Sequence, residues 1–161
     1  MARTLLSGAL IPSLVLACAC RSGNSPGPSP DRSIAPEVEY FPFAGAAGQQ
    51  RLPFSGAVRV GSVIYLSGQI GSDSTGRLVA GGIEMETRQA LENIRALLGR
   101  VGSSMDRVVK CTAMLADMSE WEAMNRVYVT YFTRHLPARS AFGSTGLARG
   151  ARIELECIAT R

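Results

Sequence analysis

Residues 151–159 read Ala-Arg-Ile-Glu-Leu-Glu-Cys-Ile-Ala, with an apolar side chain at every second position through most of the segment. Ile153 and Leu155 therefore share one face of this segment, and Glu154 and Glu156 share the other. A period of two is typical of a half-buried β-strand. Because ionised groups are seldom placed in apolar surroundings without a partner, the two carboxylates require a cation or solvent nearby.

Arg139 lies in a second strand-like segment just upstream. It follows Pro137 and precedes the small polar run at residues 140–146, so we expect it where a strand opens into a loop. A guanidinium in that place can form the wall of an anion pocket. The alternative is an intramolecular salt bridge between Arg139 and Glu154, and these two segments alone leave both interpretations open.

The residues before Arg139 predict strands alternating with helices. Apolar residues recur at spacings of three and four over residues 82–101, which predicts an amphipathic helix that ends at Gly102. Gly61 is expected to form a tight hairpin between two strands. The strands predicted in this part of the chain are at residues 38–43, 57–60, 62–67 and 108–115.

A second helix is predicted to start at a capping box formed by Ser119 and Glu122. Helical spacing explains its apolar stripe fully, so we assign the stripe to the core and not to a cofactor site. The residues of the stripe are Trp121, Met124, Tyr128, Tyr131 and Phe132.

The order of these elements predicts an α+β fold over residues 37–161. The chain has 161 residues, 46% of them hydrophobic, which is enough for one domain with its own core. Two helices that cover one face of a mixed sheet leave the opposite face open. A partner subunit could cover that face.

The N-terminal residues predict export. Arg3 precedes an uncharged apolar stretch at residues 5–17, which is too short to span a bilayer and is typical of a secretory signal. Val15-Leu16-Ala17-Cys18 resembles a bacterial lipobox, so residues 1–18 are interpreted as a lipoprotein signal with lipidation at Cys18. By resemblance to bacterial sorting rules, Ala19 favours the periplasmic face of the outer membrane. There are two alternatives. One is a signal that is cut near Cys20, which would give a soluble periplasmic protein, and the other is an ordinary N-terminal helix.

Residues 19–36 are rich in Ser, Gly and Pro, a composition that cannot bury enough apolar surface to order itself. This segment is expected to be a disordered tether. Cys111 and Cys157 both lie on predicted core faces and are expected to be buried thiols; in an oxidising compartment they could pair if their strands are neighbours.

The remaining composition makes other functions improbable. The chain has one histidine, so a metal site is not expected. The net charge of +4 is spread along the chain without a basic patch interleaved with aromatic residues, so a nucleic-acid partner is not expected either.

Several separated motifs together resemble the Rid (YjgF-like) family of reactive-intermediate deaminases, from about Leu52 to the C-terminus. In chain order they are Leu52-Pro53-Phe54-Ser55, Val63-Ile64-Tyr65-Leu66-Ser67-Gly68-Gln69-Ile70 and Thr87-Arg88-Gln89-Ala90-Leu91-Glu92-Asn93-Ile94, followed by the segment around Arg139. The resemblance implies a chorismate-mutase-like fold. It also implies a homotrimer whose sheets form a central barrel, with active sites in the clefts between subunits and no metal or cofactor.

The same resemblance suggests roles for individual residues. Arg139 matches the family's carboxylate-binding arginine and Glu154 its water-positioning acid. Two positions depart from the family pattern: Phe54 replaces a tyrosine and loses its hydroxyl, and Ala141 replaces a cysteine. The substrate-binding residues carried over in this way are Phe54, Ser67, Gly68, Asn125 and Ala141.

The implied reaction is hydrolysis of a small 2-imino or 2-enamino acid, such as 2-aminoacrylate, to a 2-keto acid and ammonia. Two other functions stay open. One is a noncatalytic module of the cell envelope that binds small carboxylates such as 2-keto acids. The other is a structural trimer in which Arg139 forms a salt bridge across the interface.

Overall fold

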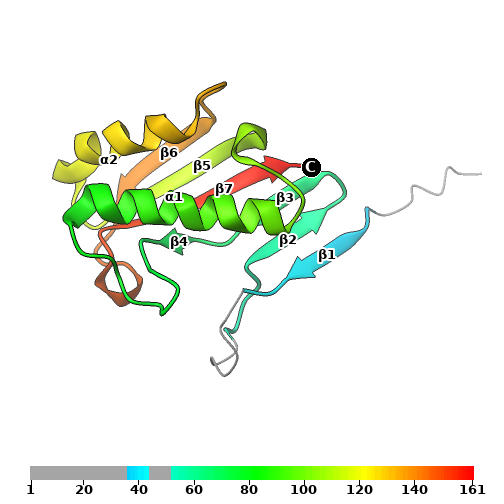
Figure 1. Ribbon diagram of the computed structural model, residues 1–161, viewed down its shortest axis with the longest axis horizontal. Helices are drawn as coiled ribbons and strands as arrows, with labels where there is room; N and C mark the ends of the chain where they lie inside the picture. The colour runs from blue at the N-terminus through cyan, green and yellow to red at the C-terminus, as the bar shows by residue number, and fades with distance from the viewer. Residues whose placement is uncertain (1–35, 44–51) are drawn as a thin grey trace, which may run out of the picture. The chain divides into compact units, whose positions relative to one another are not determined.

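The structure is a computed structural model that describes residues 36–43 and 52–161 of the chain. The predicted signal segment (1–18), with Cys18, lies outside the described residues, as does all of the predicted tether except its last residue. The description below concerns the described residues, which form a mixed sheet and its helices (Figure 1).

Seven strands form one sheet in the order β1-β2-β3-β7-β5-β6, with β4 paired to β7 beside β3. Only the β5–β6 pair is parallel, and the other pairs are antiparallel. β6 therefore ends the sheet and has β5 as its single neighbour. The strands are β1 (Val38–Phe41), β2 (Ala57–Val60), β3 (Val63–Leu66), β4 (Gln69–Ile70), β5 (Val108–Leu115), β6 (Ala138–Gly143) and β7 (Ile153–Thr160).

Two helices, α1 (Gly82–Arg100) and α2 (Trp121–Tyr128), lie against one face of the sheet (Figure 1). The alternation predicted for residues 151–159 is confirmed, because Ile153 and Leu155 are fully buried under the helices while Glu154 and Glu156 point to the other face. The α+β class is as predicted, and the element order is as predicted except for the short strand β4, which the sequence did not indicate. None of the helices in the described residues combines the length and apolar character that crossing a membrane requires.

The capping box predicted at Ser119 and Glu122 for the start of the second helix is wrong. Ser119 caps neither element: α2 begins after Glu120 without a side-chain cap, and the one cap in this region is on the turn before it, where Oδ1 of Asp117 accepts a hydrogen bond of 2.8 Å from the Ser119 backbone N–H. A 3₁₀ turn at Met118–Glu120 precedes α2. Aspartate competes for the same backbone donors as serine and here lies two residues earlier. Trp121, predicted in the core, is 40% exposed because this start places it at the margin of the helix-covered face.

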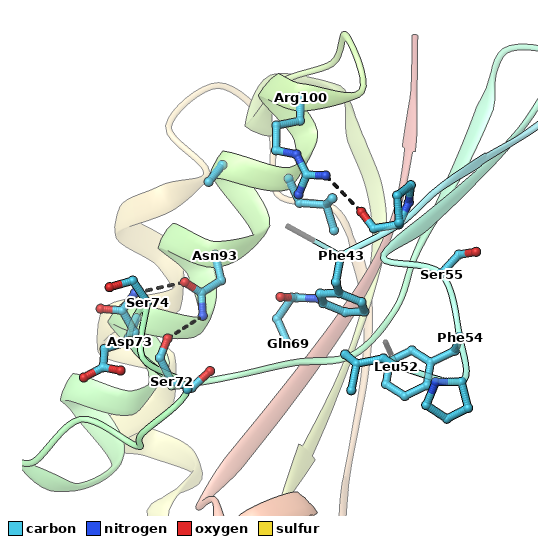
Figure 2. A pocket seen from close by; sticks show the side chains of 16 residues that line it. Phe43, Leu52, Phe54, Ser55, Gln69, Ser72, Asp73, Ser74, Asn93 and Arg100 are labelled. Carbon is cyan, nitrogen blue, oxygen red and sulfur yellow. Dashed lines mark hydrogen bonds between the residues drawn. The ribbon is translucent and has the colours of Figure 1, made fainter. Parts of the chain in front are cut away.

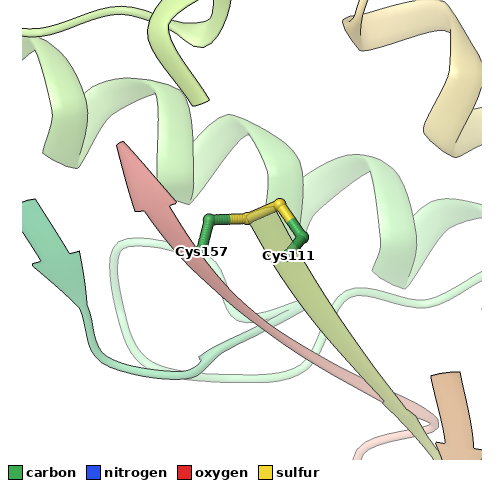
Figure 3. Close-up of a disulfide and its surroundings, with 2 residues drawn as sticks. All are labelled: Cys111 and Cys157. Atoms are coloured by element: carbon green, nitrogen blue, oxygen red, sulfur yellow. A yellow bond between two sulfur atoms is a disulfide. The ribbon is translucent and has the colours of Figure 1, made fainter. Parts of the chain in front are cut away.

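The expectation that Cys111 and Cys157 are buried thiols is also wrong, because the two residues form a disulfide (Figure 3). They lie directly opposite each other in the antiparallel β5–β7 pair. Both are on the buried face, where cross-strand neighbours have their Cβ atoms close together. The bond joins two central strands just after the irregular register between Val108 and Lys110.

Candidate functional site

Arg139 lies on β6 and points toward α2, on the helix-covered face of the sheet. It is in register with Cys111 of β5, whose side chain is buried on that face. The guanidinium lies over the ring of Tyr128, with 4.6 Å between Cζ and the ring centroid. Its Nη1 also approaches the sulfur of Met124 at 3.8 Å.

The surroundings of Arg139 do not neutralise its charge. None of the five ion pairs in the described part of the chain involves Arg139. Aromatic faces and a thioether attract a cation without supplying a negative charge. Asn125 lies on α2, the helix that Arg139 faces, and its buried Oδ1 has no hydrogen-bond partner in the described structure. Ala141 follows Arg139 on the same face of β6 and packs against the core.

Glu154 lies on the opposite, open face of the sheet, against the backbone of Gly68. A Cβ built on Gly68 would lie 1.8 Å from Oε1 of Glu154, so only glycine leaves room for this carboxylate. Burial raises the pKa of Glu154, and the neighbouring negative charge of Glu156 raises it further. The carboxyl is thereby shifted toward the range in which a group can accept a proton from water and return it.

Arg139 and Glu154 do not meet within one chain. Strand β5 lies between β6 and β7, and Met114, the β5 partner of Glu154, is three residues beyond Cys111, the β5 partner of Arg139. Two strand spacings of about 4.8 Å and three residues of about 3.3 Å separate their backbones, and the side chains point to opposite faces. The intramolecular salt bridge considered from the sequence is therefore absent.

Ser67 precedes Gly68, whose backbone adjoins Glu154, and Phe54 lies in a neighbouring segment. The Ser67 hydroxyl donates a hydrogen bond of 2.7 Å to the carbonyl oxygen of Ser55, which ties the end of β3 to the segment carrying Phe54. Phe54 is 53% exposed and packs edge-on against Phe43 with 5.5 Å between ring centroids. The predicted site residues thus form two groups: Arg139, Asn125 and Ala141 in one, and Ser67, Gly68 and Glu154 in the other, with Phe54 in the segment tied to Ser67.

Phe54 also lines a cavity of about 920 Å³ between the segment around residues 52–55 and α1 (Figure 2). Its polar groups are largely occupied by backbone partners. Gln69 donates to the carbonyl oxygens of Ser67 and Gly68, and the amide of Asn93 donates to those of Ile70 and Ser72. Asn93 thereby connects the end of β4 to α1, whereas Gln69 stabilises the turn between β3 and β4. Both residues belong to the sequence motifs, which alone assign them no role. 

No group of three His, Cys, Asp or Glu side chains that could hold a metal ion occurs within residues 36–43 and 52–161. The arrangement instead offers one uncompensated cation and, on the other face, one carboxyl group with a raised pKa. Together these groups suit a small anionic ligand and a water molecule.

Gly68→Ala is expected to displace the Glu154 carboxylate while leaving the fold intact. The new methyl group would overlap the carboxylate, the mobile end of a flexible side chain, so that group must turn away. If Glu154 acts as a base, kcat should fall about 10²-fold with little change in the melting temperature. Gly99→Ala on α1 is the matched control, because a Cβ there meets nothing within 4 Å. Unchanged kcat in Gly68→Ala would contradict a role for the present position of Glu154.

Comparison with known proteins gives a consistent result. The pattern of the family described as endoribonuclease L-PSP matches residues 46–161. The chain is 46% identical over 110 residues to the mouse protein named 2-iminobutanoate/2-iminopropanoate deaminase, covering 68% of this chain and 82% of the relative.

Two solved structures show the same fold. The Rid family protein YyfA from Yersinia pestis has a TM-score of 0.72 at 34% identity, covering 78% of this chain and 100% of the other. TdcF from E. coli, solved with bound serine, has a TM-score of 0.65 at 30% identity, covering 79% and 98%. The chain therefore belongs to the endoribonuclease L-PSP, or Rid, family, as its motifs predicted.

Proposed function

We propose that this protein hydrolyses small 2-imino and 2-enamino acids to 2-keto acids and ammonia. The observation that carries the proposal is the guanidinium of Arg139, which is held in place without any carboxylate partner in the described residues. The raised pKa of Glu154 supports the same reaction. Further support comes from the relatives named as imine deaminases and from the related structure that contains serine, a small amino acid.

In the proposed mechanism, Arg139 binds the substrate carboxylate through two parallel N–H···O hydrogen bonds. An enamine substrate first takes a proton from solvent on its terminal carbon and becomes the protonated imine. Water then adds to the imine carbon while Glu154 accepts one of its protons, which gives a neutral adduct with one hydroxyl and one amino group. Glu154 returns that proton to nitrogen, the carbon–nitrogen bond breaks to release ammonia, and the hydroxyl gives its remaining proton to solvent as it becomes the keto group of the 2-keto acid. Glu154 regains its charge at the end of the cycle.

The proposed active site requires two copies of the chain, because one copy holds Arg139 and Glu154 on opposite faces of its sheet. A homotrimer, which the family resemblance implies, would place the Arg139 group of one subunit against the Glu154 group of its neighbour. The composition of the open face supports such an assembly. Tyr65 and Phe142 are exposed on it, and Met114 and Ile158 are half-buried there.

The test of the proposed activity uses the full-length protein and 2-iminobutanoate, generated from 2-aminobutanoate by an amino-acid oxidase. Ammonia release should be faster than the spontaneous rate, in proportion to protein concentration. Absence of acceleration would reject the enzyme. Calorimetry with 2-oxobutanoate then separates the alternatives, because binding without turnover identifies the noncatalytic carboxylate-binding module, to which the missing hydroxyl at Phe54 also points.

The acid limb of the pH profile is expected to depend on Glu156. Glu154 must be ionised to act as a base, so activity should fall as the pH decreases through its raised pKa. Glu156→Gln removes the neighbouring negative charge, which lowers that pKa and moves the limb to lower pH. Glu37→Gln, at an exposed position, is the control. A limb that stays in place in Glu156→Gln would show that another group controls it.

The location proposed for this protein is the periplasmic face of the outer membrane, with a lipid anchor on Cys18. The lipobox-like sequence before Cys18 supports the lipid anchor. The Cys111–Cys157 disulfide supports export, since disulfides persist mainly in oxidising compartments. Radiolabelled palmitate should be incorporated into the full-length chain and not into Cys18→Ser. Export without labelling would instead support the soluble periplasmic form.

A further inference from the structure

The helix that faces Arg139 presents one polar and three large side chains to it. Trp121, Met124, Asn125 and Tyr128 recur at spacings of three and four along α2, so they occupy a single stripe. The rings of Tyr128 and Trp121 lie 4.6 and 6.0 Å from Cζ of Arg139, measured to their centroids. We call these two side chains the aromatic pair.

The ring of Tyr128 is fixed by packing. Tyr128 is 3% exposed, and its ring contacts that of Phe132 with 4.7 Å between centroids. Its hydroxyl is buried without a hydrogen-bond partner in the described structure. Burial raises the pKa of Tyr128 to about 12, although the charge of Arg139 opposes this, so the phenol stays neutral at ordinary pH. Arg139 lies over the ring, so its contact with Tyr128 is made by the ring face and not by the hydroxyl.

A ring face holds a guanidinium differently from a carboxylate. It attracts the positive charge but accepts none of the directed hydrogen bonds that the N–H groups would make to an anion. A carboxylate at position 128 would instead occupy those donors and cancel the charge. The aromatic pair thus restrains Arg139 and leaves its donors available.

Resting on the proposed function, we infer that Tyr128 is a positioning residue that sets the direction of the Arg139 guanidinium through its ring, with Trp121 limiting movement on the exposed side. Arg139 lies on β6, an edge strand whose one neighbour in the described sheet is β5. Hydrogen bonds therefore hold the backbone of Arg139 on the β5 side only. The rigid ring supplies the missing restraint. Its effect should appear in substrate binding, because Arg139 acts on the substrate carboxylate.

Tyr128→Leu, which removes the ring and keeps apolar bulk, is the first arm of the test. KM for 2-iminobutanoate and Kd for 2-oxobutanoate should rise about tenfold while kcat changes much less. Tyr128→Phe should restore both constants toward the wild-type values, because it keeps the ring. Tyr131→Leu is the matched control: it removes a buried ring whose cation contact is with Arg95 and not with Arg139, so it should destabilise the fold without raising KM.

Trp121→Leu provides a variant at a half-exposed position, where a failure to fold is not expected. It should raise KM less than Tyr128→Leu, in keeping with its longer distance from Arg139. Equal losses in Tyr128→Phe and Tyr128→Leu would assign the effect to the hydroxyl and overturn a role for the ring. Unchanged KM and Kd in both Tyr128→Leu and Trp121→Leu would overturn it as well.

Failure of the proposed function would look different. The wild type would then neither deaminate 2-iminobutanoate nor bind 2-oxobutanoate. In that case the Nε–Hε NMR resonance of Arg139, assigned by its loss in Arg139→Lys, still decides the structural claim. A ring-current shift that disappears in Tyr128→Leu and persists in Tyr128→Phe supports the restraint, and a resonance that is the same in all three proteins refutes it.

Discussion

Arg139→Ala is expected to lower kcat/KM for 2-iminobutanoate about 10²- to 10³-fold, because it removes two charge-assisted hydrogen bonds to the substrate carboxylate. The melting temperature should stay nearly constant, since Arg139 has no ion pair in the described residues whose loss would destabilise the fold. Arg139→Lys should show an intermediate loss, because an ammonium keeps the charge but not the planar pair of donors.

The control for this prediction is Arg134→Ala, which removes an exposed arginine with only a 3.9 Å contact to Asp106. It should leave kinetics unchanged. A different result would identify the third possibility for Arg139. If Arg139→Ala makes part of the assembly dissociate while the fraction that stays assembled still binds the ligand, Arg139 forms a structural salt bridge between subunits and is not part of a binding site.

Mixing two inactive variants tests whether the site is shared. Arg139→Ala and Glu154→Gln subunits, unfolded and refolded together, should regain activity that neither shows alone. In a random trimer with equal amounts of each variant, about a quarter of the interfaces join an intact Arg139 to an intact Glu154. No recovery, with mixed trimers demonstrated by mass spectrometry, would contradict a site shared between subunits; because the two residues lie on opposite faces of one sheet, it would also contradict their joint action on one substrate.

Removal of the disulfide is expected to be the largest single loss of stability. The bond closes a loop with a sequence separation of 46, and cross-linking a loop of that length contributes about 4 kcal/mol to the free energy of unfolding. The double variant Cys111→Ala/Cys157→Ala should therefore unfold about 10–20 °C below the wild type. Calorimetry under non-reducing conditions measures this difference.

Two observations make the disulfide prediction specific. A reductant should lower the unfolding temperature of the wild type toward that of the double variant, and it should not affect the double variant. Alkylation of the unfolded wild type without reductant should label neither Cys111 nor Cys157, since both sulfur atoms are in the disulfide. Equal stability of wild type and double variant would mean that the bond adds nothing to the native state.

Patterns confined to one element predicted that element well. The alternation around Ile153 and the three-and-four spacing from Ile83 to Leu98 depend only on strand and helix geometry, and both gave the correct buried faces. The start of α2 was harder because Asp117 and Ser119 are both good caps, and local sequence does not show that Asp117 caps a 3₁₀ turn and that α2 begins only after Glu120.

Features that depend on register between strands could not be predicted from one segment. Whether Cys111 meets Cys157 depends on how β5 pairs with β7. The direction of Arg139 depends on its register with β5, and this register turned the side chain toward α2 and away from Glu154. The sequence motifs identified both residues as candidates, but only the sheet order shows that they lie on opposite faces.

The position of β6 at the end of the sheet has a consequence for handling the protein. Along Ala138–Gly143, alternate backbone amides and carbonyls point away from β5, and no strand within residues 36–43 or 52–161 pairs with them. An isolated subunit would therefore offer a template onto which a misfolded chain could add, strand after strand. Concentrated solutions of dissociated subunits should accordingly form fibrils, and Ser140→Lys should delay their formation.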